Sequence, residues 1–145
     1  MLTLTDTLTA LTGVSPQITQ QQPIASVVID SRQAEAGSLF VALPGENVDG
    51  HNFAQAAFDA GAIVAIVDKA VNVDCAIIEA ASPQFPANWK KPVCIKVENS
   101  LLALQKLAAC WRRQFSPQVI GITGSVGKTS TKELAHSVLA QKYKT

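Results

Sequence analysis

The sequence lacks any concentration of positive charge. Its 145 residues carry 12 Lys and Arg against 11 Asp and Glu, which gives a net charge of +1. The pairs Lys90-Lys91 and Arg112-Arg113 are too short to build the basic surface that neutralises nucleic-acid phosphates. The charge pattern therefore argues against a nucleic-acid partner.

Long apolar runs and paired cysteines are missing as well. No apolar stretch approaches the ~20 residues that a membrane-spanning helix needs, and residues 1–13 lack the basic leader and apolar run of a secretory signal. The three cysteines, Cys75, Cys94 and Cys110, form neither a CxxC metal pattern nor a disulfide framework. We therefore expect a cytoplasmic chain with reduced thiols and no membrane partner.

What is present is the composition of a packed globular protein. Hydrophobic residues make up 48% of the chain and charged residues 16%. A chain of this length can bury one sizeable core, or one small domain together with part of a second. The sequence shows no internal repeat and no low-complexity tract.

Strands and helices are expected to alternate along the chain. Short β-branched and apolar runs predict strands at 24–30, 38–43, 62–68, 75–80, 93–97 and 119–123. Apolar residues at helical spacing predict helices at about 5–12, 52–60, 100–115 and 128–141. The run 62–68 shows no alternation, so we expect its strand to be covered on both faces. This order indicates an α/β fold with parallel strands.

The last two predicted helices carry apolar stripes. Asn99 or Ser100 can cap the first of them, and its stripe comprises Leu101, Leu104, Leu107, Ala108, Trp111 and Phe115. The residues that the final helix is expected to bury are Leu134, Ala135, Val138 and Leu139.

The strongest chemical signal lies between the predicted strand 119–123 and the final helix. The segment Gly124-Ser125-Val126-Gly127-Lys128-Thr129-Ser130 is glycine-rich, so its N–H groups can point at one spot beside a helix start, which favours an anion. Lys128 would reach the phosphates and the Thr129 hydroxyl would bind Mg²⁺. The pattern predicts a nucleotide-phosphate site, and an ordinary glycine turn is the alternative.

One position departs from the full phosphate-loop motif. Ile122 stands where that motif has its first glycine, which leaves a shorter G-x-x-G-K-T. The segment ITGSVGKTSTKE, Ile122 to Glu133, resembles the ATP site of the Mur ligases, which use this shortened loop. Within that family, Lys132-Glu133 is similar to the members that add D-alanyl-D-alanine.

A second segment, residues 30–62, is similar to the uridine-nucleotide-binding domain of Mur ligases. The parts that carry this resemblance are Asp30-Ser31-Arg32, Gly37, Phe40-Val41-Ala42-Leu43, Gly45, Asp49-Gly50-His51 and Gly61-Ala62. The resemblance covers nearly the whole chain except residues 71–92. It implies a UDP-substrate-binding domain at 1–97, followed at 98–145 by the incomplete start of a central ATP-binding domain with its strand, phosphate loop and helix.

The resemblance also implies contacts to the UDP-linked substrate. The residues concerned are Ser31, Arg32, Gly45, Asp49, Gly50 and His51. The residue pattern alone favours a plain ion pair of Arg32 with Asp30 or Glu35. It also favours a structural role for His51, and it has Asp49 and Gly50 holding the loop in shape rather than touching the ligand.

The activity implied by the resemblance is peptide-bond formation. Such an ATP-dependent, ADP-forming ligase joins D-alanyl-D-alanine to UDP-N-acetylmuramoyl-tripeptide through an acyl phosphate, with ATP and Mg²⁺ bound at Lys128 and Thr129. We expect a monomer. The alternatives are a family member that adds the third amino acid, or a non-catalytic nucleotide-binding module.

Residues up to Thr145 hold only part of that machinery, because the adenine and dipeptide sites of the family lie further along the chain. We therefore expect the 145-residue chain alone to be inactive. The strand 119–123 should then pack on the first part of the chain, pair between molecules, or be poorly ordered.

Overall fold

The computed structural model describes residues 2–17, 22–45, 48–85 and 92–144. The chain forms two compact units, Met1–Gln114 and Phe115–Thr145. Among the described helices, none combines the length and apolar character that a membrane crossing requires. The predicted surface loop 82–92 lies partly outside the described residues.

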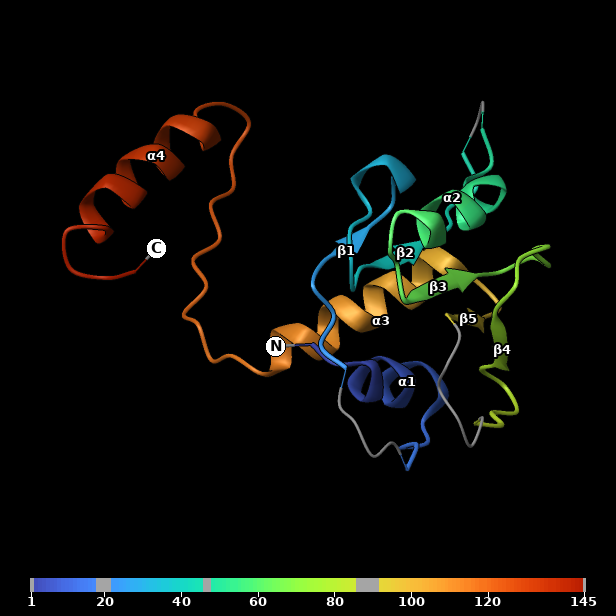
Figure 1. Cartoon of the computed structure of the whole chain (residues 1–145). Helices are drawn as coiled ribbons and strands as arrows, with labels where there is room; N and C mark the ends of the chain where they lie inside the picture. Colours follow the sequence, from blue (N-terminus) through green and yellow to red (C-terminus); the bar gives the residue numbers. More distant parts are fainter. Residues whose placement is uncertain (1, 18–21, 46–47, 86–91, 145) are drawn as a thin grey trace. The chain divides into compact units, whose positions relative to one another are not determined.

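The first unit is built on a sheet of five parallel strands (Figure 1). These strands are β1 (Val27–Val28), β2 (Leu39–Val41), β3 (Val64–Val67), β4 (Ala76–Glu79) and β5 (Val93–Lys96). Their order is β1-β2-β3-β5-β4, with Val64 opposite Leu39 on one side and Val93 on the other. The α/β fold with parallel strands is therefore confirmed.

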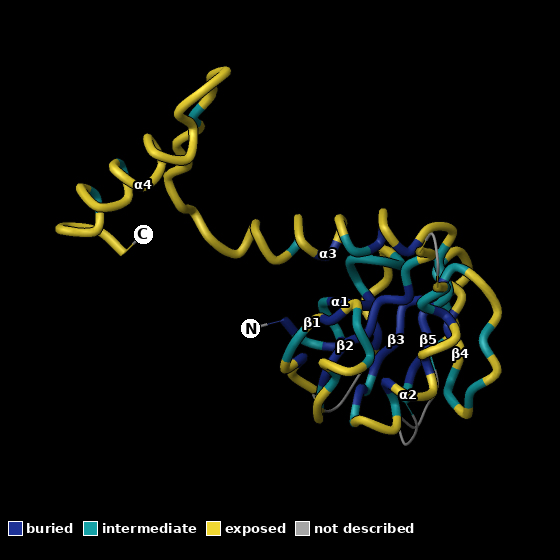
Figure 2. Tube along the Cα trace, turned by 90° about the horizontal axis from the view of Figure 1, so that it is seen from above, coloured by how far each residue is buried: buried dark blue, intermediate teal, exposed yellow. Residues whose placement is uncertain are grey.

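Helices cover both faces of this sheet. One face packs against α1 (Leu4–Thr12) and α3 (Ser100–Arg113), and its core includes Leu8, Ile66 and Leu107. The other face packs against α2 (Ala54–Asp59), and its core includes Phe40 and Ala57. All four residues of β3 are buried between these layers, as the unbroken apolar run predicted (Figure 2).

Local hydrogen bonds explain where the helices begin. At the start of α1, the Thr3 hydroxyl accepts from the Asp6 N–H while the Asp6 carboxylate accepts from the Thr3 N–H, a capping box. Helix α3 begins after Asn99, whose side-chain oxygen accepts from the Leu102 N–H at 2.8 Å. Asn99, rather than Ser100, is therefore the cap.

The predicted stripe on α3 is correct only in its middle. Leu107 is buried and Leu104 packs against the core, but Leu101 is 49% exposed. The face that the helix buries is formed instead by Ser100, Ala103 and Leu107. The small Ser100 and Ala103 side chains allow the first turns of the helix to approach the sheet, which turns Leu101 toward solvent.

The second unit contains one helix, α4 (Lys128–Leu139). The prediction of a strand at 119–123 is wrong for the described residues, where this segment forms no ladder and Val119 is 76% exposed. The predicted burial of the α4 stripe is also wrong, since Leu134 is 70% exposed. Figure 2 shows most of α4 in the colour of exposed residues. A strand needs a neighbouring strand and a helix needs a second layer, and residues 115–145 supply neither.

The boundary between the compact units falls after Gln114, and the functional boundary at 97/98 stays a prediction. The first unit extends to Gln114 because α3 packs on its sheet through Ala103 and Leu107.

A matched pair of isoleucines tests this core. Ile66 on β3 is fully buried, whereas Ile77 on β4 is 58% exposed. Ile66→Ala should lower the free energy of unfolding by about 2–5 kcal/mol, because it removes apolar contacts and leaves a cavity. Ile77→Ala should cost about 1 kcal/mol or less. Urea unfolding followed by circular dichroism measures both, and equal losses would contradict the layer arrangement.

Candidate functional site

The polar residues of the first unit gather where its parallel strands end. Asp30 and Arg32 follow β1, Asp49 and His51 follow β2, and Asp68 follows β3. Because the strands run in one direction, their carboxyl ends share one edge, which is where α/β sheets bind ligands. We name residues 30–33 together with 44–45 and 48–51 the β1–β2 corner.

Arg32 in this corner forms an ion pair with Asp30. Its Nε lies 2.9 Å from Asp30 Oδ1 and its Nη2 lies 2.6 Å from Asp30 Oδ2. The hydrogen bond from the guanidinium lowers the pKa of the Asp30 carboxyl from 3.8 to about 2. The pairing that the residue pattern favoured is therefore present, in the first turn of a 3₁₀ helix at Ser31–Gln33.

Two polar groups of the corner stay available. The Arg32 side chain is 86% exposed, and its Nη1 binds nothing among the described residues. The half-buried Ser31 hydroxyl likewise has no partner within the described chain. A cation donor and a hydroxyl side by side can bind the carbonyl or phosphate oxygens of a ligand.

The loop that follows β2 owes its shape to backbone contacts. Pro44 and Asp49 form an antiparallel bridge, the Gly45 N–H donates to the Val48 carbonyl at 3.2 Å, and the Gly50 N–H donates to the Leu43 carbonyl at 3.0 Å. A Cβ at position 50 would lie 2.7 Å from the Leu43 carbonyl oxygen, so only glycine fits there. Gly50 therefore shapes the loop.

His51 is held inside the protein. Its side chain is 5% exposed, its Nδ1 is hydrogen-bonded to Asp49 Oδ1, and its Nε2 lies 3.1 Å from the Asp68 backbone nitrogen. Asp49 Oδ2 also accepts from Lys69 Nζ at 2.6 Å. The hydrogen bond from Lys69, and to a smaller extent that from His51, holds the pKa of the Asp49 carboxyl well below its usual range. Both polar side chains are engaged with the protein, as expected for structural residues.

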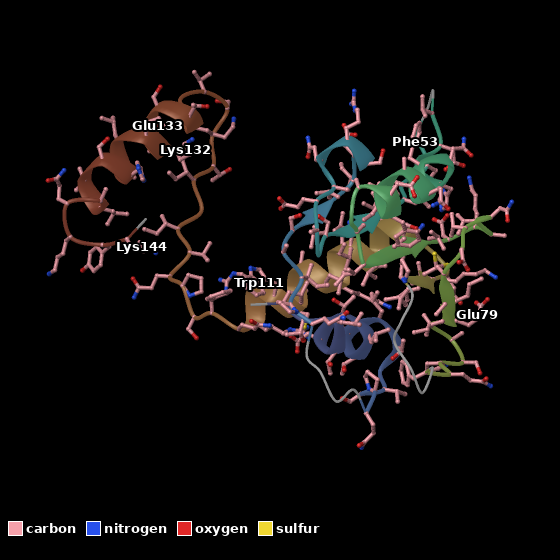
Figure 3. All side chains as sticks on the ribbon, in the orientation of Figure 1. Phe53, Glu79, Trp111, Lys132, Glu133 and Lys144 are labelled. Atoms are coloured by element: carbon pink, nitrogen blue, oxygen red, sulfur yellow. The ribbon has the colours of Figure 1, made fainter. Side chains whose placement is uncertain are left out.

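Sequence reasoning missed Asp68 and Lys69. The signal was available, because these two polar residues directly follow the unbroken apolar run of β3 and therefore had to lie at the carboxyl edge of the sheet. Further along the same edge, the described chain has a cavity of about 370 Å³ whose lining includes Glu79, Lys96 and Lys106. Glu79, which is labelled in Figure 3, forms an ion pair there with Lys96 at 3.0 Å.

The predicted phosphate loop precedes α4 in the second unit. Gly127, at φ 82°, is in the left-handed region and is followed directly by the helix. Within the described residues, the N–H groups of Ser125, Val126 and Gly127 donate no hydrogen bond. These donors lie beside the positive end of a helix, an arrangement that favours an anion.

The side chains of this loop fit a nucleotide phosphate with its metal ion. Lys128 Nζ donates to the Gly124 carbonyl at 2.6 Å, so the ammonium lies over the loop. The Thr129 and Ser130 hydroxyls have no partner among the described residues. Further along α4, Lys132 is paired with Glu133 at 2.6 Å (Figure 3), which lowers the pKa of the Glu133 carboxyl.

Comparison with known proteins now identifies the class. The family model described as "Mur ligase family, catalytic domain" matches residues 23–112, more than half of the chain. The chain belongs to the Mur ligase family. The matched residues contain the β1–β2 corner and end before the loop at 124–130. The resemblance predicted from the sequence is therefore confirmed.

Several relatives share one particular name, UDP-N-acetylmuramoyl-tripeptide–D-alanyl-D-alanine ligase. The one from Bacillus subtilis is 38% identical over 133 residues, which cover 92% of this chain and 26% of the relative. The one from Synechocystis is 42% identical over 118 residues, which cover 81% of this chain and 23% of the relative. These names agree with the resemblance noted at Lys132-Glu133.

Solved structures give the same result. MurF from Acinetobacter baumannii matches with a TM-score of 0.68 and 32% identity, over 95% of this chain and 27% of its own. The MurF ligase from Thermotoga maritima, solved in complex with ADP, matches with a TM-score of 0.64 and 34% identity, over 82% of this chain and 24% of its own. The chain thus spans about a quarter of the length of the relatives it matches.

The Asp30–Arg32 pair gives a titration test. The pKa of Asp30 in the folded chain is below its ordinary value of 3.8, so the pair stabilises the fold above that pH and is lost as the pH falls through about 2. In Arg32→Ala, the pKa of the Asp30 carboxyl should rise from about 2 toward 3.8 in carbon-detected NMR but stay below 3.8, because the backbone N–H of residue 32 still donates to the carboxylate. Lys96→Ala, which removes a cation at the other end of the sheet edge, should leave Asp30 unchanged. A midpoint near 2 in Arg32→Ala would contradict the assigned cause.

Proposed function

We propose that this chain provides the UDP-substrate corner and the ATP-phosphate loop of a ligase that adds D-alanyl-D-alanine to UDP-N-acetylmuramoyl-tripeptide. The main support is that one chain of the Mur ligase family contains both groups of donors. Ser31 and Arg32 are available in the β1–β2 corner, and N–H groups are available in the loop at 124–130. The relatives' shared name supplies the choice of substrates. UDP-linked precursors and ATP are metabolites of the cytoplasm, where we place the reaction.

We assign substrate binding to the first unit. The Ser31 hydroxyl and Arg32 Nη1 would contact the uridine part, and the loop at Gly45 would approach the ribose and diphosphate with its backbone. Asp49, Gly50 and His51 would hold that loop in shape, since their contacts are made within the protein. Exposed donors at a strand end can reorient toward a ligand at little cost.

We assign the phosphate end of ATP to the second unit. The N–H groups from Gly124 to Gly127 would bind the phosphates, Lys128 would leave the Gly124 carbonyl to contact the transferred group, and Thr129 would hold Mg²⁺. When bound, Mg²⁺ neutralises phosphate charge. The main obstacle to joining the tripeptide carboxylate to phosphate is charge repulsion, which the Lys128 ammonium reduces. The carboxylate oxygen would take the terminal phosphoryl group of ATP as ADP leaves. The dipeptide amine would then attack the carbon of this acyl phosphate, forming the amide bond and releasing phosphate and a proton.

Calorimetry on this chain tests the corner. UDP-N-acetylmuramoyl-tripeptide should bind, and Arg32→Ala should weaken binding by about tenfold or more, because it removes a charged hydrogen bond. Ser31→Ala should weaken it by about three- to tenfold. Gln33→Ala, an exposed neighbour in the same 3₁₀ turn, is the matched control. Affinities equal to wild type in both Ser31→Ala and Arg32→Ala would remove the corner from the site.

The phosphate loop is tested by turnover in a ligase that carries this sequence together with the remaining length of its relatives. Lys128→Ala should lower kcat by about 10²–10³, because the charge that builds up in phosphoryl transfer loses a donor. Lys132→Ala, one turn further along α4 and paired with Glu133, is the control and should stay within a few-fold of wild type. Equal effects of the two changes would argue against the loop assignment.

A further inference from the structure

Three segments of the chain meet around the His51 side chain. They are the loop at 48–51 after β2, Asp68 after β3, and the start of α3, which follows β5. The strands β2, β3 and β5 are neighbours in the sheet, so these segments leave the same edge side by side. Hydrogen bonds that run through His51 and Asp68 therefore link the loop at 48–51 to the end of β3 and the start of α3, which are distant from it in sequence.

The imidazole makes this link with both ring nitrogens. Nε2 accepts from the Asp68 N–H at 3.1 Å, so in the neutral ring the proton is on Nδ1 and is donated to Asp49 Oδ1. Asp49 in turn accepts from Lys69 Nζ, the residue after Asp68. The side chains that follow β2 and β3 thus close a ring of contacts around a group that is 5% exposed.

Asp68 extends the link to α3. Its Oδ2 accepts from the Ser100 N–H at 3.1 Å, which places a carboxylate at the positive start of that helix. Its Oδ1 lies 3.0 Å from His51 Nε2 and, among the described residues, has no hydrogen-bond donor. A buried acceptor without a donor is costly. The carboxylate therefore holds this position because Oδ2 accepts from the Ser100 N–H, and not because of a hydrogen bond at Oδ1.

We propose that Asp68 and His51 are positioning residues that set the shape of the substrate loop by joining it to β3 and to the start of α3. This inference rests on the proposed function, because Gly45 and residues 48–51 belong to the part that would approach the UDP-linked substrate. Neither side chain contacts the substrate. Loss of either link should leave the loop free to move and reduce affinity, while the sheet core remains intact.

Calorimetric binding of UDP-N-acetylmuramoyl-tripeptide to this chain tests the inference. Asp68→Ala should weaken binding by about tenfold, because it removes the acceptor of the Ser100 N–H, while the backbone N–H of residue 68 can still donate to His51. Asp68→Asn should stay within about threefold of wild type. Its amide oxygen keeps the Ser100 bond, and its amide nitrogen puts a donor where Oδ1 had none.

A second variant isolates the histidine link. His51→Asn retains a side-chain donor near the Nδ1 position, toward Asp49, but lacks the atom that reaches Asp68. It should weaken binding about as much as Asp68→Ala. The double variant should lose at most about twofold more affinity, because the His51–Asp68 bond and the Asp68–Ser100 bond are successive links of one path from the loop to α3, and breaking either link interrupts that path. Should Asp68→Ala fail to fold, His51→Asn alone supports the inference by losing affinity or overturns it by retaining it.

The controls separate this inference from the proposed function. Asp59→Ala removes an exposed carboxylate on α2 that is bonded to Gln55, and it should bind like wild type. If Ser31→Ala and Arg32→Ala weaken binding while Asp68→Ala and His51→Asn do not, the positioning role is overturned and the proposed function stands. If Asp68→Asn weakens ligand binding as much as Asp68→Ala does, the role assigned to the side-chain oxygen that accepts from the Ser100 N–H is wrong. If the wild-type chain does not bind this ligand at all, the proposed function fails and the inference fails with it.

Discussion

The parallel direction of the five strands determines where the polar residues that follow β1, β2 and β3 lie. Antiparallel strands would send the residues that follow β1, β2 and β3 to opposite edges of the sheet. Parallel strands send them to one edge, where Arg32, His51 and Asp68 follow neighbouring strands. Burial on both faces is the condition for such a sheet, and α1, α2 and α3 provide it.

Along that edge, the polar residues divide into two kinds. Asp49, His51 and Asp68 form hydrogen bonds with one another, with Lys69 and with the backbone. Their polar groups are therefore used within the protein. The Ser31 hydroxyl and Arg32 Nη1 form no hydrogen bond within the described chain. This division has a physical basis, because a loop keeps a fixed shape only when some of its polar groups are satisfied internally.

The second unit is organised differently. Its loop depends on glycine conformations and a helix start, both of which are local properties of residues 124–130. Such a site needs few distant contacts to present its N–H groups. The exposed apolar side chains of α4 show that residues 115–145 do not by themselves supply a second layer for it.

The sequence by itself determined the elements whose causes are local. The start of α3 at Asn99 or Ser100, the unbroken run of β3, the glycine-rich loop before Lys128 and the family resemblance were all visible as residue patterns. Tertiary structure alone decided which apolar residues are buried. Leu101 and Val119 looked like core residues, and they are exposed because burial depends on whether another layer covers them. It also decided the partners of His51, since a contact between residues 51 and 68 arises only when two strands align side by side.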